Sequence, residues 1–113
     1  MIAKELAEKL FGDCLSFIEF QTHVVDSDVV SGGDKFLFDL LKVLENCSFE
    51  EVKQVSDLLK EEKEKHANKI EMLKHADLKM YEKKMEIIKY AYLNAVFLCD
   101  LRKRLIIDEL ASK

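Results

Sequence analysis

Apolar residues recur at three- and four-residue steps in the first part of the chain, which is the period of an amphipathic α-helix. The pattern begins at Ile2, has charged residues on its opposite side, and predicts a helix over about residues 2–25. It decays where aspartates and β-branched residues favour irregular backbone, and two glycines follow. We therefore expect the main turn at about residues 26–33.

Two shorter apolar stretches follow this turn. The first predicts a helix over about residues 34–46, and the second predicts a helix over about residues 49–66. Ser48 precedes the second of these, with Glu51 three residues later. This is the spacing of a capping box, in which each residue's side chain bonds to the other's backbone N–H. It sets the expected start of that helix.

No glycine or proline interrupts residues 49–111. A single helix of this length would measure about 95 Å, whereas a compact domain of this size has a radius of gyration of about 13 Å. Apolar periodicity is missing over residues 60–69, where Asn68 and Glu71 are suited to cap a new helix. The expectation is a break near Asn68 and a last helix over about residues 69–111. One unbroken rod is the alternative.

Length and composition agree with a helical fold. The chain has 113 residues, three glycines and no proline, whereas β-sandwiches and barrels need a turn every ten residues or so. We predict a single all-α domain over residues 1–113: a helical bundle with a long C-terminal helix. The last helix is much longer than the expected helices beside it, so we also expect dimerisation to complete the bundle.

The middle of that last helix is apolar on nearly every side. Twelve of the fifteen residues from Ile87 to Leu101 are apolar or aromatic. On a helical wheel its charged residues form one polar stripe, at 100° per residue. Three apolar residues, Leu93, Val96 and Phe97, interrupt the stripe midway, and the polar residue Asn94 lies beside them among apolar neighbours. These four residues are the expected interface.

An apolar patch on a well-charged helix is typical of an interface. A second copy of the same chain is the economical partner, so we predict a homodimer or higher homo-oligomer. Asn94 would then fix the register, as buried polar residues do in coiled coils. The alternative is that a folded-back N-terminal segment covers the patch within one chain.

Charge is distributed unevenly along the chain. Residues 1–59 hold five Lys/Arg against twelve Asp/Glu, a net charge of −7, and residues 60–113 hold thirteen against ten, a net charge of +3. The densest basic spot, Arg102–Lys103–Arg104, is a candidate anion-binding site. The competing interpretation is pairing with nearby acidic residues such as Asp100 and Asp108. No aromatic residues interleave with these cations, so stacking on bases is not indicated.

Catalytic and metal-binding motifs are weak. Residues 26–37 resemble a calcium loop at three aspartates but lack its central glycine and its final glutamate. Glu62–His66 and Glu71–His75 repeat a metal-ligand spacing, yet on one helix the two histidines would point in opposite directions. Glu61 and Glu64 give one ExxE segment, as in magnesium-dependent all-helical nucleotide hydrolases, with no ExxD after it. We expect no metal, no cofactor and no enzymatic activity.

The three cysteines have no metal-binding or disulfide-framework spacing, and each lies among apolar neighbours. We expect reduced, buried thiols and a cytoplasmic or other reducing compartment, with no signal peptide and no membrane span. The predicted function is non-enzymatic assembly through protein–protein contacts. The alternatives are nucleic-acid association through residues 102–104 and, third, metal-dependent nucleotide hydrolysis.

Overall fold

The computed structural model describes residues 2–23 and 38–112. The helices in these ranges are α1 (Ile2–His23), the 3₁₀-helix η1 (Lys42–Leu44), α3 (Phe49–Lys69), α4 (Leu73–Ala76) and α5 (Leu78–Ala111). Residues 38–41 form a further helical turn that leads into η1. Strands are absent from this described part of the chain, so the all-α prediction is confirmed.

Most of the helix boundaries agree with the sequence pattern as far as the structure describes them. The predicted turn at 26–33 and the start of the helix at 34–46 lie outside the described residues. The capping box is confirmed: the backbone N–H of Glu51 donates to the Ser48 hydroxyl at 3.2 Å, and the N–H of Ser48 donates to the Glu51 carboxylate at 3.3 Å.

The long helical region breaks next to Asn68, as predicted, but the last helix starts later than the pattern indicated. Helix α3 continues to Lys69, and α5 begins only at Leu78. Asp77 is the N-cap of α5: its backbone is extended, with φ −154° and ψ 90°, and its carboxylate accepts a hydrogen bond from the N–H of Met80 at 3.1 Å. The predicted start at residue 69 with Asn68 as cap is therefore wrong, and so is the unbroken rod.

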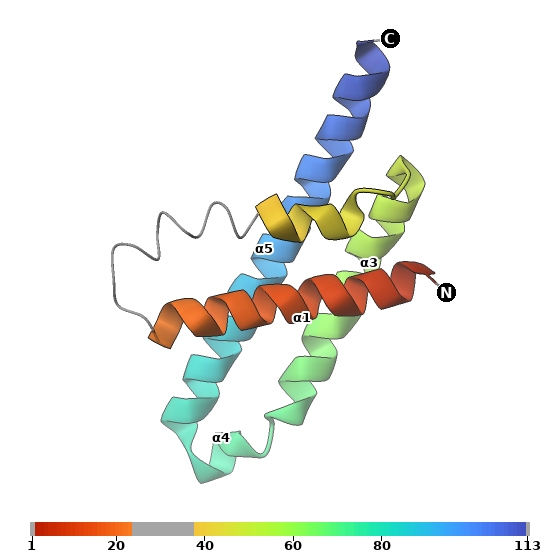
Figure 1. Ribbon diagram of the computed structural model, residues 1–113. Coiled ribbons are helices and arrows are strands. Elements are labelled where there is room, and N and C mark those ends of the chain that lie inside the picture. The colour runs from red at the N-terminus through yellow and green to blue at the C-terminus, as the bar shows by residue number, and fades with distance from the viewer. Residues whose placement is uncertain (1, 24–37, 113) are drawn as a thin grey trace.

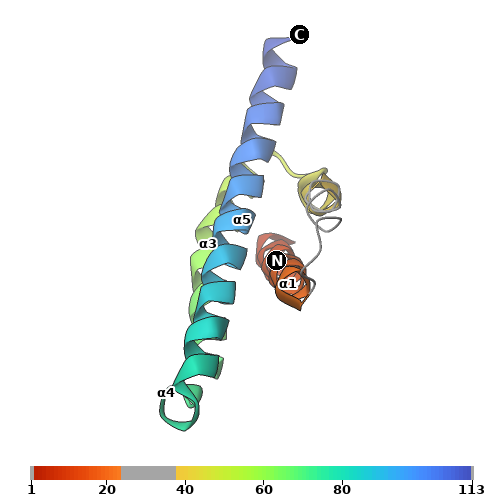
Figure 2. The ribbon, with the colours of Figure 1, turned by 90° about the vertical axis from the view of Figure 1, so that its left-hand side faces the viewer.

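Helices α3 and α5 form an antiparallel hairpin, with the short α4 at its closed end (Figure 1). Helix α5 has 34 residues and α3 has 21, so α5 measures about 51 Å and α3 about 32 Å. The last turns of α5 project beyond every other described element (Figures 1 and 2). The prediction of a long C-terminal helix is confirmed.

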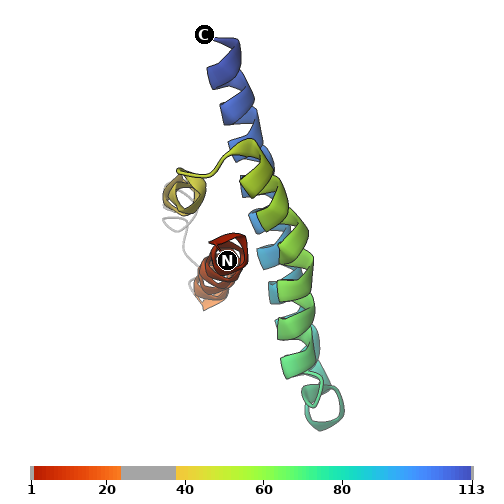
Figure 3. The same ribbon diagram turned by 90° about the vertical axis from the view of Figure 1, so that its right-hand side faces the viewer.

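The bundle has two layers. Helix α1 crosses one face of the α3–α5 hairpin steeply, and the segment 38–44 lies beside α1 on that same face (Figures 2 and 3). No described residue covers the opposite face of the hairpin. The molecule measures 56 × 35 × 16 Å along its principal axes. A two-layer bundle thus leaves one broad side of the hairpin unpacked.

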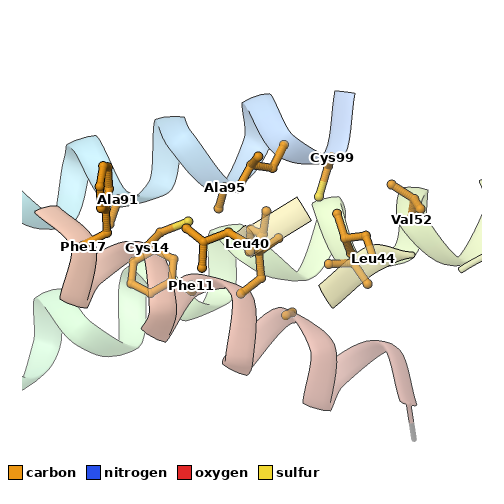
Figure 4. Packing of buried hydrophobic residues seen from close by; sticks show 14 of the residues in the cluster. Phe11, Cys14, Phe17, Leu40, Leu44, Val52, Ala91, Ala95 and Cys99 are labelled. Atoms are coloured by element: carbon orange, nitrogen blue, oxygen red, sulfur yellow. The ribbon is translucent and has the colours of Figure 1, made fainter. Parts of the chain in front are cut away.

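The hydrophobic core fills the space between the layers (Figure 4). From α1, Phe11, Cys14 and Phe17 point towards the hairpin. Helix α5 meets them with small residues, Ala91 and Ala95, which are fully buried and let the helices approach closely. The remaining buried members come mainly from α3, α5 and the segment 38–47: Leu40, Leu44, Cys47, Val52, Val55, Leu59, Ile88, Leu98 and Cys99.

Candidate protein–protein interface

The outer side of α5, facing away from the core, carries an exposed row of residues at alternating four- and three-residue steps. We call it the outer stripe; it consists of Glu86, Tyr90, Leu93, Phe97, Asp100 and Arg104, all of which are exposed. The alternating step is the a/d spacing of a coiled coil. Buried residues of α5, such as Ala91, Ala95 and Leu98, occupy the opposite side. Helix α5 therefore has two apolar faces, of which the residues that the structure describes cover one.

Large apolar side chains at the centre of the outer stripe are exposed to solvent. Leu93 is 50% exposed and Phe97 is 56% exposed. Single exposed apolar residues are common on protein surfaces, but adjacent large ones on one helix face are typical of binding sites. Tyr90 is 46% exposed and extends this apolar centre by one turn.

The four residues predicted as the interface divide into two groups. Leu93 and Phe97 lie on the outer stripe, whereas Val96 and Asn94 are half-buried at its edges. Val96 packs against the hydrophobic core. Tyr90 was not among the predicted residues, although its three-residue step to Leu93 and seven-residue step to Phe97 place it on the same row.

The basic cluster is contiguous in sequence but not in space. Arg102 donates from Nη2 to the backbone carbonyl of Glu45 at 2.8 Å, which ties α5 to the end of η1. Lys103 pairs with Asp100 at 3.3 Å along the same helix. Arg104 belongs to the outer stripe. Because successive residues on a helix point about 100° apart, these three cations face three directions and do not converge on one anion.

A second candidate site is a groove at the closed end of the hairpin. It has a volume of about 440 Å³ and an apolar floor that includes Ile70, Ile87 and Ile88. Three lysines, Lys69, Lys83 and Lys84, and one carboxylate, Glu19, also line it. These lysines are suited to anions in general, but surface lysines on mobile stems define no geometry for a particular ligand.

His66 lines this groove, and its ring packs against the core. Its ring stacks on Phe11 with 4.9 Å between ring centroids. Burial lowers the pKa of His66 below 6.5, and the neighbouring Lys69 lowers it further. The imidazole is therefore neutral at pH 7, as expected of a packed side chain.

Acidic residues on α3 do not assemble a metal site with these histidines. Glu62 is buried and pairs with Lys65 at 3.7 Å, and Lys65 also approaches Glu8 of α1 at 3.9 Å. His75 is exposed in α4, at the hairpin's closed end. Within residues 2–23 and 38–112, no three His, Cys, Asp or Glu side chains lie close enough together to hold an ion.

The three cysteines are free and buried, as predicted. Burial raises the pKa of the Cys14 thiol from its ordinary value of 9.0 to about 12, with Asp13 and Cys99 adding to the effect. Burial likewise raises the pKa of Cys99 to about 12, with Asp100 adding to it. Both thiols are therefore neutral and unreactive at neutral pH.

These raised pKa values predict alkaline destabilisation. An unfolded thiol ionises near pH 9, whereas Cys14 and Cys99 hold their protons to about pH 12 when folded. Their contribution to stability is complete below pH 9 and falls as the pH rises towards 12, by about 1.4 kcal/mol per pH unit for each thiol. Urea unfolding across pH 8–11 measures it. Cys14→Ala should lower the stability at pH 8 but flatten its alkaline slope; an unchanged slope would contradict the assignment.

No further candidate site follows from membrane-spanning helices or from similarity to known proteins. Among the described helices, none combines the length and apolarity that crossing a bilayer requires. Comparison with known proteins finds no matching family model, no similar curated protein and no similar solved structure.

Proposed function

We propose that this protein acts by protein–protein contact, as a homo-oligomer assembled through the outer stripe of α5. The observation that carries the proposal is the exposure of Leu93 and Phe97 on the side of α5 opposite the core. A chain that buries alanines on one side of a helix and exposes leucine and phenylalanine on the other has large apolar side chains still to cover.

The length of α5 supports the same conclusion. Helix α3 accompanies only part of α5, and the projecting C-terminal turns expose further large apolar residues: Leu105, Ile107 and Leu110. A second copy packed along α5 would extend the bundle beyond the described helices of this chain, which do not reach the last turns of α5.

The charges along the outer stripe favour a second copy as the partner. Glu86 lies towards the N-terminal end of the stripe and Arg104 towards its C-terminal end, with the apolar centre between them. A matching partner needs the reverse order of charge, and a copy of the same stripe provides it when turned end to end.

The expected affinity is moderate. Fully burying a leucine or phenylalanine is worth about 1.5–3 kcal/mol, and these two are already half covered. Four such side chains per dimer give a gain comparable to the lower estimates of the association cost, about 4 kcal/mol. A dissociation constant of about 1 µM needs about 8 kcal/mol beyond that cost. Tyr90, the flanking charges and the exposed residues Leu105, Ile107 and Leu110 of the projecting turns have to supply it.

Light-scattering mass across a concentration series tests the proposal. The wild type should change from monomer to dimer over micromolar concentrations. Leu93→Glu or Phe97→Glu should raise the dissociation constant at least about 100-fold, equivalent to about 2.7 kcal/mol, because each dimer would bury two carboxylates.

Phe38→Glu is the matched control, because Phe38 is 65% exposed and belongs to the segment 38–44, which lies on the face of the hairpin that α1 crosses (Figures 2 and 3). It should leave the dissociation constant unchanged. A wild type that stays monomeric at high micromolar concentration, or a dimer indifferent to both α5 substitutions, would refute the proposal.

A further inference from the structure

We infer that two copies pair antiparallel along the outer stripe, in one register, with the two-fold axis level with Ala95. The inference rests on the homo-oligomer proposed above and specifies its geometry. It follows from the spacing of the six outer-stripe residues, which is symmetric in position and complementary in chemistry.

Three pairs share the same midpoint. The pair Leu93 and Phe97 has its midpoint at residue 95. The pair Tyr90 and Asp100 and the pair Glu86 and Arg104 have the same midpoint. In an antiparallel pair of helices with its axis at that level, each residue faces the other member of its pair on the partner. Each contact therefore occurs twice, once on either side of the axis.

Every one of these pairs is chemically matched. Leu93 packs on the partner's Phe97 at the centre, where both side chains are at least half exposed in the single chain. The Tyr90 phenol faces the carboxylate of the partner's Asp100, to which it can donate a hydrogen bond. Glu86 faces the partner's Arg104, whose guanidinium suits a two-point contact with a carboxylate.

The half-buried flank of the stripe agrees with this register. Asn94 lies just to one side of the stripe and one residue from the axis, so it faces the partner's Asn94. Two amides can donate to and accept from each other. A polar pair of this kind fixes register in coiled coils.

Two points oppose the register. One three-residue step beyond each end of the row lie Lys83 and Ile107, both exposed, and the register sets this lysine against the partner's isoleucine. The other point is on the flank opposite Asn94. Lys89 faces the partner's Lys103 there, but Asp100 already pairs with Lys103 at 3.3 Å and offsets part of this charge. A parallel pair is worse, because it would place Glu86 against the partner's Glu86 and Arg104 against the partner's Arg104. Charges at the rim of an interface set orientation more than affinity, and here they select the antiparallel arrangement.

Cysteine cross-linking tests this register. Glu86→Cys and Arg104→Cys are prepared as separate, distinguishable chains, mixed, and oxidised mildly. The antiparallel register brings position 86 of one chain to position 104 of the other, whereas two copies of position 86 lie about 27 Å apart along the helices. The mixed dimer also keeps one intact pair, Glu86 of one chain with Arg104 of the other. The native cysteines are buried and do not compete.

The cross-link between the two different variants should exceed each same-variant cross-link at least tenfold. Glu82→Cys mixed with Arg104→Cys is the control, because it is displaced by one helical turn and should cross-link several-fold less. Predominant same-variant cross-links would show a parallel pair. A dimer by mass without the 86–104 cross-link would also overturn the register while leaving the oligomer in place, whereas a monomeric wild type would overturn the proposed function itself.

Charge reversal provides a second test. Glu86→Arg places an arginine against the partner's Arg104 and should raise the dissociation constant several-fold. Combining it with Arg104→Glu restores opposite charges in the antiparallel register and should return the constant to near the wild-type value. Failure of the double variant to recover, with both variants folded by circular dichroism, would contradict the pairing.

Discussion

Replacing Ala95 by aspartate should unfold a large fraction of the protein. Ala95 is fully buried where α5 meets α1, so the new carboxylate would have neither water nor a cation to compensate it. Burying an unpaired charge costs several kcal/mol, and a domain of this size has a total stability of about 5–15 kcal/mol. Urea unfolding followed by circular dichroism measures the loss.

Leu93→Asp is the matched control for this substitution. It introduces the same residue two positions earlier on the same helix, on the exposed side. Monomer stability should fall by only about 1–2 kcal/mol, because Leu93 is half exposed, while association should be lost. Equal destabilisation by the two substitutions would mean that the core and the outer stripe have been assigned to the wrong sides of α5.

Replacing Phe11 by alanine should lower the free energy of unfolding by about 3–5 kcal/mol, the usual cost of removing a fully buried phenylalanine. Phe11 has no exposed surface, and its ring also covers one side of His66. Urea unfolding at fixed protein concentration gives the size of the loss, with Phe38→Ala as a control that should change stability by less than about 0.5 kcal/mol.

A second measurement identifies the cause of this loss. Burial is the main reason why the pKa of His66 lies below 6.5. Opening a cavity beside the imidazole should admit water and raise that pKa towards 6.5, as an NMR titration of the ring protons would show. A destabilised Phe11→Ala variant whose His66 titrates as in the wild type would show that Phe11 acts without shielding the histidine.

Local motifs were predictable where they have a fixed spacing. The capping box of Ser48 and Glu51 spans three residues, so the sequence alone determined the start of α3. The break after α3 has no such motif. Asn68 and Asp77 are both acceptable caps, and the choice depends on packing: with the turn after Lys69, His66 stays on Phe11 and Ile70 packs against the core.

Part of the candidate interface was also predictable from the sequence. The interruption of the polar stripe identified Leu93 and Phe97 from helical geometry alone. Val96 was included because it falls on the same arc of the helical wheel as the polar stripe, but its burial depends on what packs beside α5. The divergence of Arg102, Lys103 and Arg104 follows from helical geometry, whereas the contact of Arg102 with the Glu45 carbonyl depends on a partner distant in sequence.

The two-layer construction has a consequence for cooperativity. Seven of the core residues belong to α1: Ala3, Ala7, Leu10, Phe11, Cys14, Phe17 and Ile18. Among the described residues they face a hairpin with no second core on its other side, so undocking α1 uncovers the buried side chains that α3 and α5 direct towards it. Regions that open in the same event exchange their amide hydrogens with the same free energy. Protection in the middle of α1 should therefore match that of the buried turns of α3 and α5, and the fold should open as one unit.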